Sequence, residues 1–201
     1  MDASADIRAR KVALRRATMA ARRTLDVRAR AEASRTIGGR LLALPELSRA
    51  RVVALYAALD EETDLTSVVP RLHERRIRTL FPRVRGDHLD LVEIRDPAAL
   101  RPGFRGIREP VGISIELGIV DAVVMPGVAF DPNGGRLGQG GGHYDRLVPS
   151  FPEATVRIGV CFACQVVPAV PSEAHDVPVD VVVTEHAVHR PRHPRGSPTQ
   201  A

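Results

Sequence analysis

The sequence predicts a single α/β domain built around a largely parallel sheet. Apolar segments of strand length alternate with segments in which apolar residues recur at helical spacing, and this alternation is typical of βα units. The strand-length segments are rich in valine and apolar on both faces, as parallel strands covered on both sides are. A length of 201 residues also fits one large domain better than two very small ones.

Two helices are predicted at the N-terminus, after a flexible segment over residues 1–5. Over residues 6–23, apolar and small side chains recur near helical spacing among many charged ones, which predicts an amphipathic helix. Asp26 has the short polar side chain that caps helices, and an apolar stripe follows it as far as Leu44. Pro45 ends this second helix, because proline cannot donate the backbone hydrogen bond that a helix requires.

Strands and helices alternate after this point. Residues 51–57 form a valine-rich apolar segment of strand length, and residues 78–84 form another strand. A helix is predicted between them over residues 66–75, where Pro70 is tolerated because it lies near the helix start. Residues 88–94 alternate apolar and polar side chains, which predicts a strand with one exposed face.

The C-terminal half is predicted to contain one helix and three strands. The segment over residues 95–118 is rich in proline and glycine and is predicted to be mostly loop, and a helix is expected to begin near Gly142. The strands are expected over residues 121–127, 156–162 and 179–184. The folded domain is therefore expected to span residues 6–186. Residues 187–201 carry too few apolar side chains to pack, which predicts a disordered basic tail.

The charge of the chain is basic and comes almost wholly from arginine. There are 29 basic and 24 acidic residues, a formal charge of +5, and Lys11 is the only lysine. The arginines are scattered and aromatic residues make up only 3%, so stacking platforms for single-stranded nucleic acid are scarce. No nucleic-acid partner is therefore expected, and an RNA-associated protein is the alternative that the basic composition leaves open. The natural ligand is expected to be anionic.

Nothing in the sequence predicts a membrane or secreted protein. No apolar run approaches the roughly 20 residues that a membrane span needs. The N-terminus has charged residues where a signal peptide has an apolar core. Two cysteines, Cys161 and Cys164, cannot build a disulfide framework, which favours the reducing cytoplasm. We therefore expect a cytoplasmic protein with no membrane partner.

The strongest functional signal is a glycine-rich stretch between a predicted strand and a predicted helix. Residues 134–142 hold six glycines in nine positions. Glycine lets backbone N–H groups approach an anion closely, and a helix N-terminus adds the positive end of its dipole. No Gly-Lys-Ser/Thr sequence follows, so this is not the P-loop pattern. A tight loop without a ligand is the alternative for such a sequence.

Side chains within and after this stretch favour a phosphate site. Arg136 supplies a guanidinium for phosphate, Tyr144 supplies an aromatic plane, and Asp145 supplies a carboxylate for a cation. Together with the glycines, they predict a phosphate-binding loop.

Residues 126–146 resemble the signature of 5-formyltetrahydrofolate cyclo-ligases, also called 5,10-methenyltetrahydrofolate synthetases, which reads approximately PGxAFDxxGxRLGxGxGYYDR. Nearly every fixed position is present, although His143 stands where the family has its first tyrosine. Other segments of the chain match the family in the same order along the sequence, at Lys11, Arg15, Glu62, Phe81-Pro82, Glu109-Pro110 and the segment from His175 to Asp180. The resemblance covers residues 7–186 and implies a three-layer α/β sandwich.

The resemblance implies sites for ATP, a folate and a magnesium ion. The family's ATP-binding positions correspond to Lys11, Arg15, Arg136, Leu137, Gly138, Gln139, Gly140, Gly141, Gly142, His143 and Tyr144. The folate is expected to contact Glu62, Gln139, Gly140, Gly141, Gly142 and His143. A magnesium ion is expected to join Asp145 and Asp180 to the ATP phosphates. Lys11, Arg136 and Tyr144 are expected to act in catalysis.

Two of these assignments depend wholly on the resemblance. Taken alone, Glu62 follows two other acidic residues and would be a solvated loop acid. Asp180 opens a valine-rich segment and would be a strand-start residue that bonds a turn.

The resemblance also implies an enzyme that converts 5-formyltetrahydrofolate to 5,10-methenyltetrahydrofolate, with ATP consumed and ADP and phosphate released. The formyl oxygen is phosphorylated and N10 then closes the ring. This phosphoryl transfer requires positive charge, a metal and positioning, and no protein nucleophile. The expected partners are ATP and the folate, with or without a polyglutamate tail, and the expected state is a monomer or weak dimer. The alternative is a non-catalytic folate- or nucleotide-binding protein of the same fold.

Overall fold

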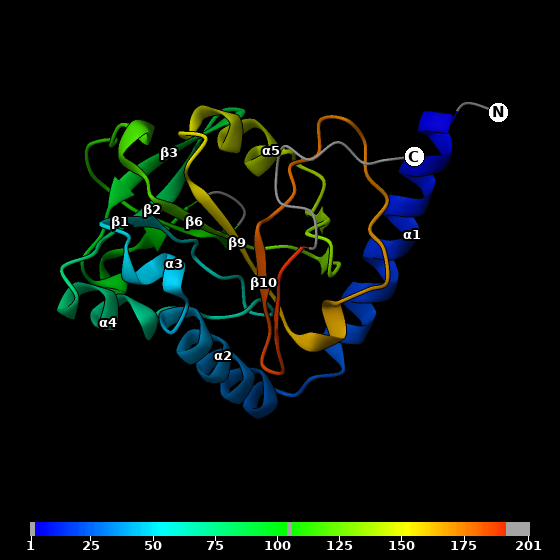
Figure 1. Ribbon diagram of the computed structural model, residues 1–201, viewed down its shortest axis with the longest axis horizontal. Coiled ribbons are helices and arrows are strands. Elements are labelled where there is room, and N and C mark those ends of the chain that lie inside the picture. Colours follow the sequence, from blue (N-terminus) through cyan, green and yellow to red (C-terminus); the bar gives the residue numbers. More distant parts are fainter. Residues whose placement is uncertain (1–2, 104–105, 192–201) are drawn as a thin grey trace.

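A seven-stranded sheet forms the centre of the molecule. The computed structural model describes residues 3–103 and 106–191, and Figure 1 shows the sheet with helices around it. Its strands are, in chain order, β1 (Val52–Ala54), β2 (Arg78–Arg85), β3 (His88–Glu93), β6 (Ala122–Met125), β9 (Val156–Val160), β10 (Val181–Val183) and β11 (Val188–His189). They lie side by side in the order β11-β10-β9-β6-β1-β2-β3.

The five inner strands of this sheet are parallel, and one antiparallel strand closes each edge. β10, β9, β6, β1 and β2 pair in parallel, whereas β3 and β11 pair antiparallel with β2 and β10. β1, β6 and β10 are buried along their whole length, as valine-rich strands covered on both faces are. The predicted α/β fold with a mostly parallel sheet is confirmed.

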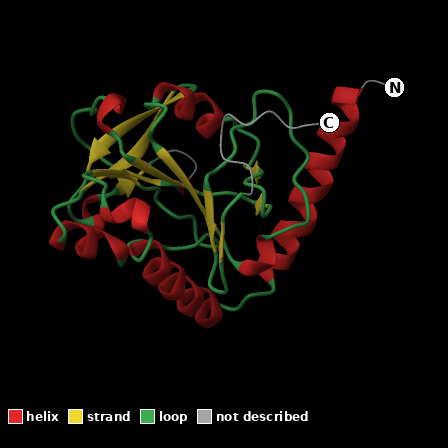
Figure 2. Ribbon diagram, in the orientation of Figure 1, coloured by secondary structure: helices red, strands yellow, loops and turns green. Residues whose placement is uncertain are grey.

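Helices cover both faces of the sheet and make three layers (Figure 2). One face packs against α2 (Val27–Leu42), α3 (Pro45–Ser48) and α4 (Val68–Glu74) through a cluster that includes Ile37, Leu47 and Leu72. The other face packs against α5 (His143–Leu147) and the 3-10 turn η4 (Val148–Ser150), where Leu147 and Val148 are buried. Asp26 caps α2 as predicted, because its carboxylate accepts a hydrogen bond from the Ala29 N–H at 2.8 Å.

The N-terminal helix α1 (Ala3–Arg23) lies beside the sheet layers, along the right of Figure 1. It packs next to the short turn η5 (Ala163–Gln165). Its buried positions are Lys11, Thr18 and Arg22, so the face that meets the rest of the protein is largely polar. This helix therefore docks mainly through polar and charged contacts, and its Leu14 packs against a small apolar cluster of Ala129, Leu137 and Val170. No helix in the described ranges is long and apolar enough to cross a membrane.

Two predicted boundaries are wrong at the chain ends. Helix α1 begins at Ala3, inside the segment over residues 1–5 that was expected to be flexible. Strand β11 lies inside the tail expected to be disordered from residue 187, because its backbone pairs with Val182 and Val183 of β10. Residues 1–2 and 192–201 lie outside the described ranges, so the prediction for them is untested.

Several short elements were missed in the loops. The segment over residues 95–118 contains two 3-10 turns, η1 (Pro97–Ala99) and η3 (Leu117–Ile119), and the paired strands β4 (Arg101–Pro102) and β5 (Arg108–Glu109). A second small hairpin, β7 (Ala129–Phe130) with β8 (Arg136–Leu137), carries the start of the glycine-rich stretch. Two-residue strands show no periodicity in sequence, which explains why they were not predicted.

Candidate functional site

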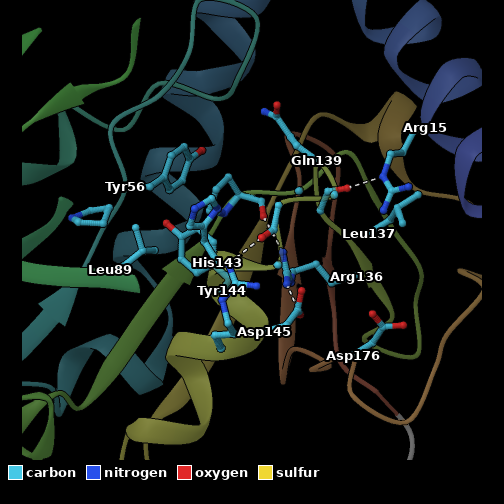
Figure 3. A pocket seen from close by; sticks show the side chains of 18 of the residues that line it. Arg15, Tyr56, Leu89, Arg136, Leu137, Gln139, His143, Tyr144, Asp145 and Asp176 are labelled. Carbon is cyan, nitrogen blue, oxygen red and sulfur yellow. Dashed lines mark hydrogen bonds and ion pairs between the residues drawn. The ribbon is translucent and has the colours of Figure 1, made fainter. Parts of the chain in front are cut away.

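A cavity of about 840 Å³ lies at the carboxyl edge of the sheet (Figure 3). Tyr56 follows β1 and Pro126 follows β6, and both line it. The glycine-rich stretch, α1 and the loop before β10 supply the remaining walls near these two residues. In parallel α/β sheets this edge is where ligands bind. The fold therefore places the predicted loop at the expected ligand site.

Arg136 is the most enclosed of the basic side chains in the cavity. Its side chain is 3% exposed, and its Nη2 donates to Asp145 Oδ1 at 2.5 Å. Its guanidinium carbon lies 5.7 Å from the centre of the Tyr144 ring, within cation–π range. Tyr144 and Asp145 belong to α5, which starts directly after the glycines. The three side chains that predicted a phosphate loop therefore lie together, as Figure 3 shows.

The glycines allow the loop to turn where other residues would be strained. Gly140 and Gly142 have φ values of 100° and 67°, in the left-handed region that favours glycine. α5 itself has only five residues. The helix dipole expected to help bind an anion is therefore weak, and backbone N–H groups and side chains must supply that role.

Lys11 and Arg15 extend from α1 to the cavity, as the resemblance implied. Arg15 Nε donates to the Gly138 carbonyl oxygen at 2.8 Å, which fastens the glycine-rich stretch to the helix. Lys11 Nζ lies 2.9 Å from Glu173 Oε2 and 2.5 Å from Asp176 Oδ2. Burial alone would lower the pKa of Lys11, but hydrogen bonds and charge from Asp176 and Glu173 outweigh it and raise that pKa. Lys11 is therefore a charged ammonium.

Glu62 is not the solvated loop acid that its neighbours suggest. It is half-buried and lines the cavity. Its Oε1 accepts a hydrogen bond from Gln139 Nε2 at 2.8 Å, and its Oε2 accepts one from the Leu59 N–H at 3.1 Å. Burial raises the pKa of Glu62, and these two hydrogen bonds offset the rise only in part. The structure thus brings together two residues that the resemblance assigned to the folate.

The cavity has an apolar side that complements its charged side. Pro82, Val84 and Leu89 of the β2–β3 hairpin line it, together with Ile107. Tyr144 lines the cavity with Arg136 over its ring, and burial raises the pKa of Tyr144, so the phenol stays neutral. This region was not predicted as part of the site, although the match at Phe81-Pro82 pointed to the same hairpin.

The predicted pairing of Asp145 and Asp180 around one metal is not reproduced. Asp145 lines the cavity, whereas Asp180 is not among the residues that do. Asp180 immediately precedes β10, and its Oδ2 accepts a hydrogen bond from the Arg157 N–H at 2.8 Å. It thus has the strand-start role that its position alone suggests, at the amino end of β10 and away from the cavity at the carboxyl edge.

The cavity can still supply a magnesium ligand. The described residues hold no cluster of three or more histidine, cysteine, aspartate or glutamate side chains suited to a metal. Mg²⁺ needs only one or two protein carboxylates when phosphate oxygens and water complete its shell. Asp145 meets this requirement, because its carboxylate lies at the cavity beside Arg136.

Sequence reasoning missed Glu173 and gave Asp176 no contact with Lys11. Both lie in the loop before β10 and line the cavity. The matched segment from His175 to Asp180 was the available signal. It could not reveal the contact, because Lys11 is separated from them by 162 and 165 positions.

An α/β sheet with a glycine loop and basic side chains at its carboxyl edge defines a class of proteins that bind anionic ligands there. Comparison with known proteins narrows this class. The sequence model of the 5-formyltetrahydrofolate cyclo-ligase family matches residues 7–185. The chain belongs to this family, and the predicted enzyme class is confirmed.

Individual relatives agree with this assignment. The 5-formyltetrahydrofolate cyclo-ligase of Escherichia coli K12 is 29% identical over 174 residues, which cover 83% of this chain and 96% of the relative. The enzyme of the same name from Haemophilus influenzae is 31% identical over 161 residues, which cover 76% of this chain and 86% of the relative. The structure of Aquifex aeolicus 5,10-methenyltetrahydrofolate synthetase superposes with a TM-score of 0.81 at 37% identity, over 94% of this chain and 96% of that one.

Proposed function

We propose that this chain catalyses the ATP-dependent cyclisation of 5-formyltetrahydrofolate to 5,10-methenyltetrahydrofolate, with release of ADP and phosphate. The observation that carries the proposal is a single cavity in which family-matched residues from three distant segments meet. Lys11 and Arg15 come from α1, Glu62 from the loop after β1, and the glycine-rich stretch from the loop after β8.

The charged side of the cavity suits the ATP phosphates. Lys11, Arg15 and Arg136 can supply positive charge to the phosphates, and glycines 138 and 140–142 allow backbone N–H groups to approach them. Asp145 would hold Mg²⁺, which when bound neutralises charge on the transferred phosphoryl group. Asp180 is left out of this proposal because it lies outside the cavity.

The apolar side suits the pterin and benzoyl rings of the folate. Leu89, Pro82 and Ile107 offer apolar contact, and Glu62 with Gln139 offers polar groups that can orient ring nitrogens. In this arrangement the N5-formyl group points toward the charged side, where the γ-phosphate lies.

The proposed chemistry has two steps, which balance. The formyl oxygen attacks the γ-phosphorus and the bond to the β–γ bridging oxygen breaks, which releases ADP and leaves an imidate-type phosphate. N10 then attacks the activated carbon, the C–O bond breaks, and phosphate leaves with the former formyl oxygen. The N10 proton is lost to solvent. The protein's part is to hold the two substrates in line and to stabilise the charge on the phosphoryl group.

An optical assay tests this function. The conjugated methenyl product absorbs differently from the 5-formyl substrate, so its formation can be followed with ATP, Mg²⁺ and 5-formyltetrahydrofolate. We expect product only when all three are present, with ADP formed in equal amount. Tight binding of folate and ATP without product would favour the non-catalytic alternative. Monomeric or weakly dimeric state, cytoplasmic location and acceptance of polyglutamate tails remain predictions.

A further inference from the structure

The ammonium of Lys11 is enclosed by the carboxylates of Glu173 and Asp176. Its side chain is 8% exposed, and the partners Glu173 and Asp176 are 20% and 18% exposed. The Asp176 carboxylate also accepts a hydrogen bond from the Glu173 N–H at 2.6 Å, so the two acids are held by a compact turn. The segment that carries them, orange in Figure 1, runs beside α1.

Positively and negatively charged side chains are equally numerous around the whole cavity. Five lysine or arginine side chains and five aspartate or glutamate side chains line it. Arg136 is paired with Asp145, as Lys11 is with Glu173 and Asp176. A phosphate that approaches Lys11 therefore meets negative charge as well as positive charge. Two of the three ammonium hydrogens of Lys11 are already directed at carboxylate oxygens.

We propose that Glu173 and Asp176 form a carboxylate latch that holds Lys11 when no nucleotide is bound, and that phosphate binding transfers the ammonium from the latch to the phosphate. The identity of the phosphate ligand, ATP, rests on the proposed function. Glu173 and Asp176 are positioning residues in this scheme, because they act through Lys11. The latch keeps the buried ammonium charged and fixed in position. It also weakens nucleotide binding, because the carboxylates compete with the phosphate for Lys11.

A purely structural role for the same ion pairs predicts a different outcome. If Glu173 and Asp176 served only to dock α1, losing one of them would loosen α1 and weaken nucleotide binding. If they compete with phosphate for Lys11, losing one of them strengthens nucleotide binding. The direction of the change in Kd therefore separates the two roles.

The first measurement probes the latch without any nucleotide. Lys11 is the only lysine, so an amine-selective acylating reagent can modify only Lys11 and the α-amino group, and mass spectrometry separates the two. We expect Lys11 to react several-fold faster in Glu173→Gln than in the unaltered chain, because the variant loses one charged partner. Glu116→Gln removes the same charge from an exposed site outside the cavity and should leave the rate unchanged. Equal Lys11 rates in Glu173→Gln and the unaltered chain would overturn the latch.

The second measurement is the Kd of Mg-ATP by calorimetry. We expect Glu173→Gln to lower this Kd by about threefold or more, because like charges beside a site disfavour a second anion. Asp176→Asn should act in the same direction, and thermal melting checks that each variant is folded. A higher or unchanged Kd in folded variants would overturn the latch. Failure of ATP to bind the unaltered chain would instead contradict the proposed function. The rate of Lys11 labelling would then still show whether the two carboxylates restrain the lysine.

Discussion

Lys11 is the single lysine of a chain with 29 basic residues, and it lies where an ATP-binding lysine is expected. An ammonium is a compact charge on a flexible stem, whereas guanidinium is a rigid planar fork. The enclosed space beside Glu173 and Asp176 suits the former. Lys11→Arg should therefore lower turnover about tenfold or more, equivalent to ~1.4 kcal/mol of transition-state stabilisation. Steady-state kinetics at saturating ATP measures the change.

A matched substitution serves as control for this prediction. Arg16 lies on the same helix, is exposed and does not line the cavity. Arg16→Lys exchanges the same two residue types and should leave turnover unchanged. Full turnover in Lys11→Arg would mean that Lys11 only contributes charge, which arginine supplies equally well.

Glu62 should make stability depend on pH. Burial raises its pKa above the ordinary value of 4.5, so the folded chain binds this proton more tightly than the unfolded chain. The stability linked to Glu62 is thus fully present below pH 4.5 and is lost as pH rises through the raised pKa. Glu62→Gln removes this loss. The Tm of the variant minus that of the unaltered chain should therefore grow as pH rises above 4.5.

Melting curves between about pH 4 and pH 8 test this, over the range in which a shifted carboxyl group titrates. Glu116→Gln, at an exposed site, should show a constant Tm difference. A constant difference for Glu62→Gln as well would show that Glu62 ionises as freely in the folded chain as in the unfolded one.

The Glu62→Gln variant should also bind 5-formyltetrahydrofolate more weakly, because one carboxylate oxygen that can orient the ligand is replaced by an amide N–H₂.

Residues close in sequence were easier to predict as a site than residues far apart. Arg136 and Asp145 are only nine positions apart, with Tyr144 between them, and all three meet at the cavity. The match to the family added Lys11, which lies far away in sequence. The match also pointed to Asp180, which does not line the cavity, because a motif does not record at which end of a strand a side chain lies. The Lys11–Glu173 contact depends on tertiary packing alone.

At the scale of elements, α1 is the unusual one, because a charged residue is buried in its contact face. The Arg22 side chain is 4% exposed, and its Nη2 lies 3.4 Å from Glu61 Oε2. Within the described ranges, its Nε and Nη1 have no hydrogen-bond partner. A buried charge loses its hydration, and a poorly formed ion pair does not fully compensate for the free energy that this costs. Arg22→Met should therefore raise the free energy of unfolding by about 1 kcal/mol.

Chemical denaturation measures this change. The Arg22→Met substitution does not leave the Glu61 carboxylate unpaired, because Glu61 still lies 3.2 Å from Arg23. Arg23→Met is the control, since Arg23 is 61% exposed and its replacement should change stability by less than about 0.5 kcal/mol. A clear loss of stability in Arg22→Met would show that Arg22 is needed to dock α1.

The elements that sequence predicted well are those whose burial sets their composition. β1, β6 and β10 are valine-rich because both faces are covered, and their positions follow from that. β11 was missed because its two residues gain stability from pairing with β10 and not from their own apolar pattern. The helix after the glycines was predicted in the right place, but its length of five residues was not.

At the scale of the whole molecule, one cavity joins a charged side and an apolar side. The two sides are built from elements far apart in sequence, α1 and the β2–β3 hairpin, with the glycine-rich stretch between them. Under the proposed function, this arrangement would bring the two substrates into contact at one point. We therefore expect the formyl oxygen of the folate to receive the γ-phosphoryl group of ATP directly within this cavity.

An isotope measurement tests this direct transfer. 5-Formyltetrahydrofolate carrying ¹⁸O in its formyl group is converted with unlabelled ATP and Mg²⁺ in unlabelled water, and the inorganic phosphate is analysed by mass spectrometry. The proposed steps leave the former formyl oxygen bonded to phosphorus, so each phosphate should contain one ¹⁸O atom. Phosphate without the label, formed together with the methenyl product, would contradict direct transfer to the formyl oxygen.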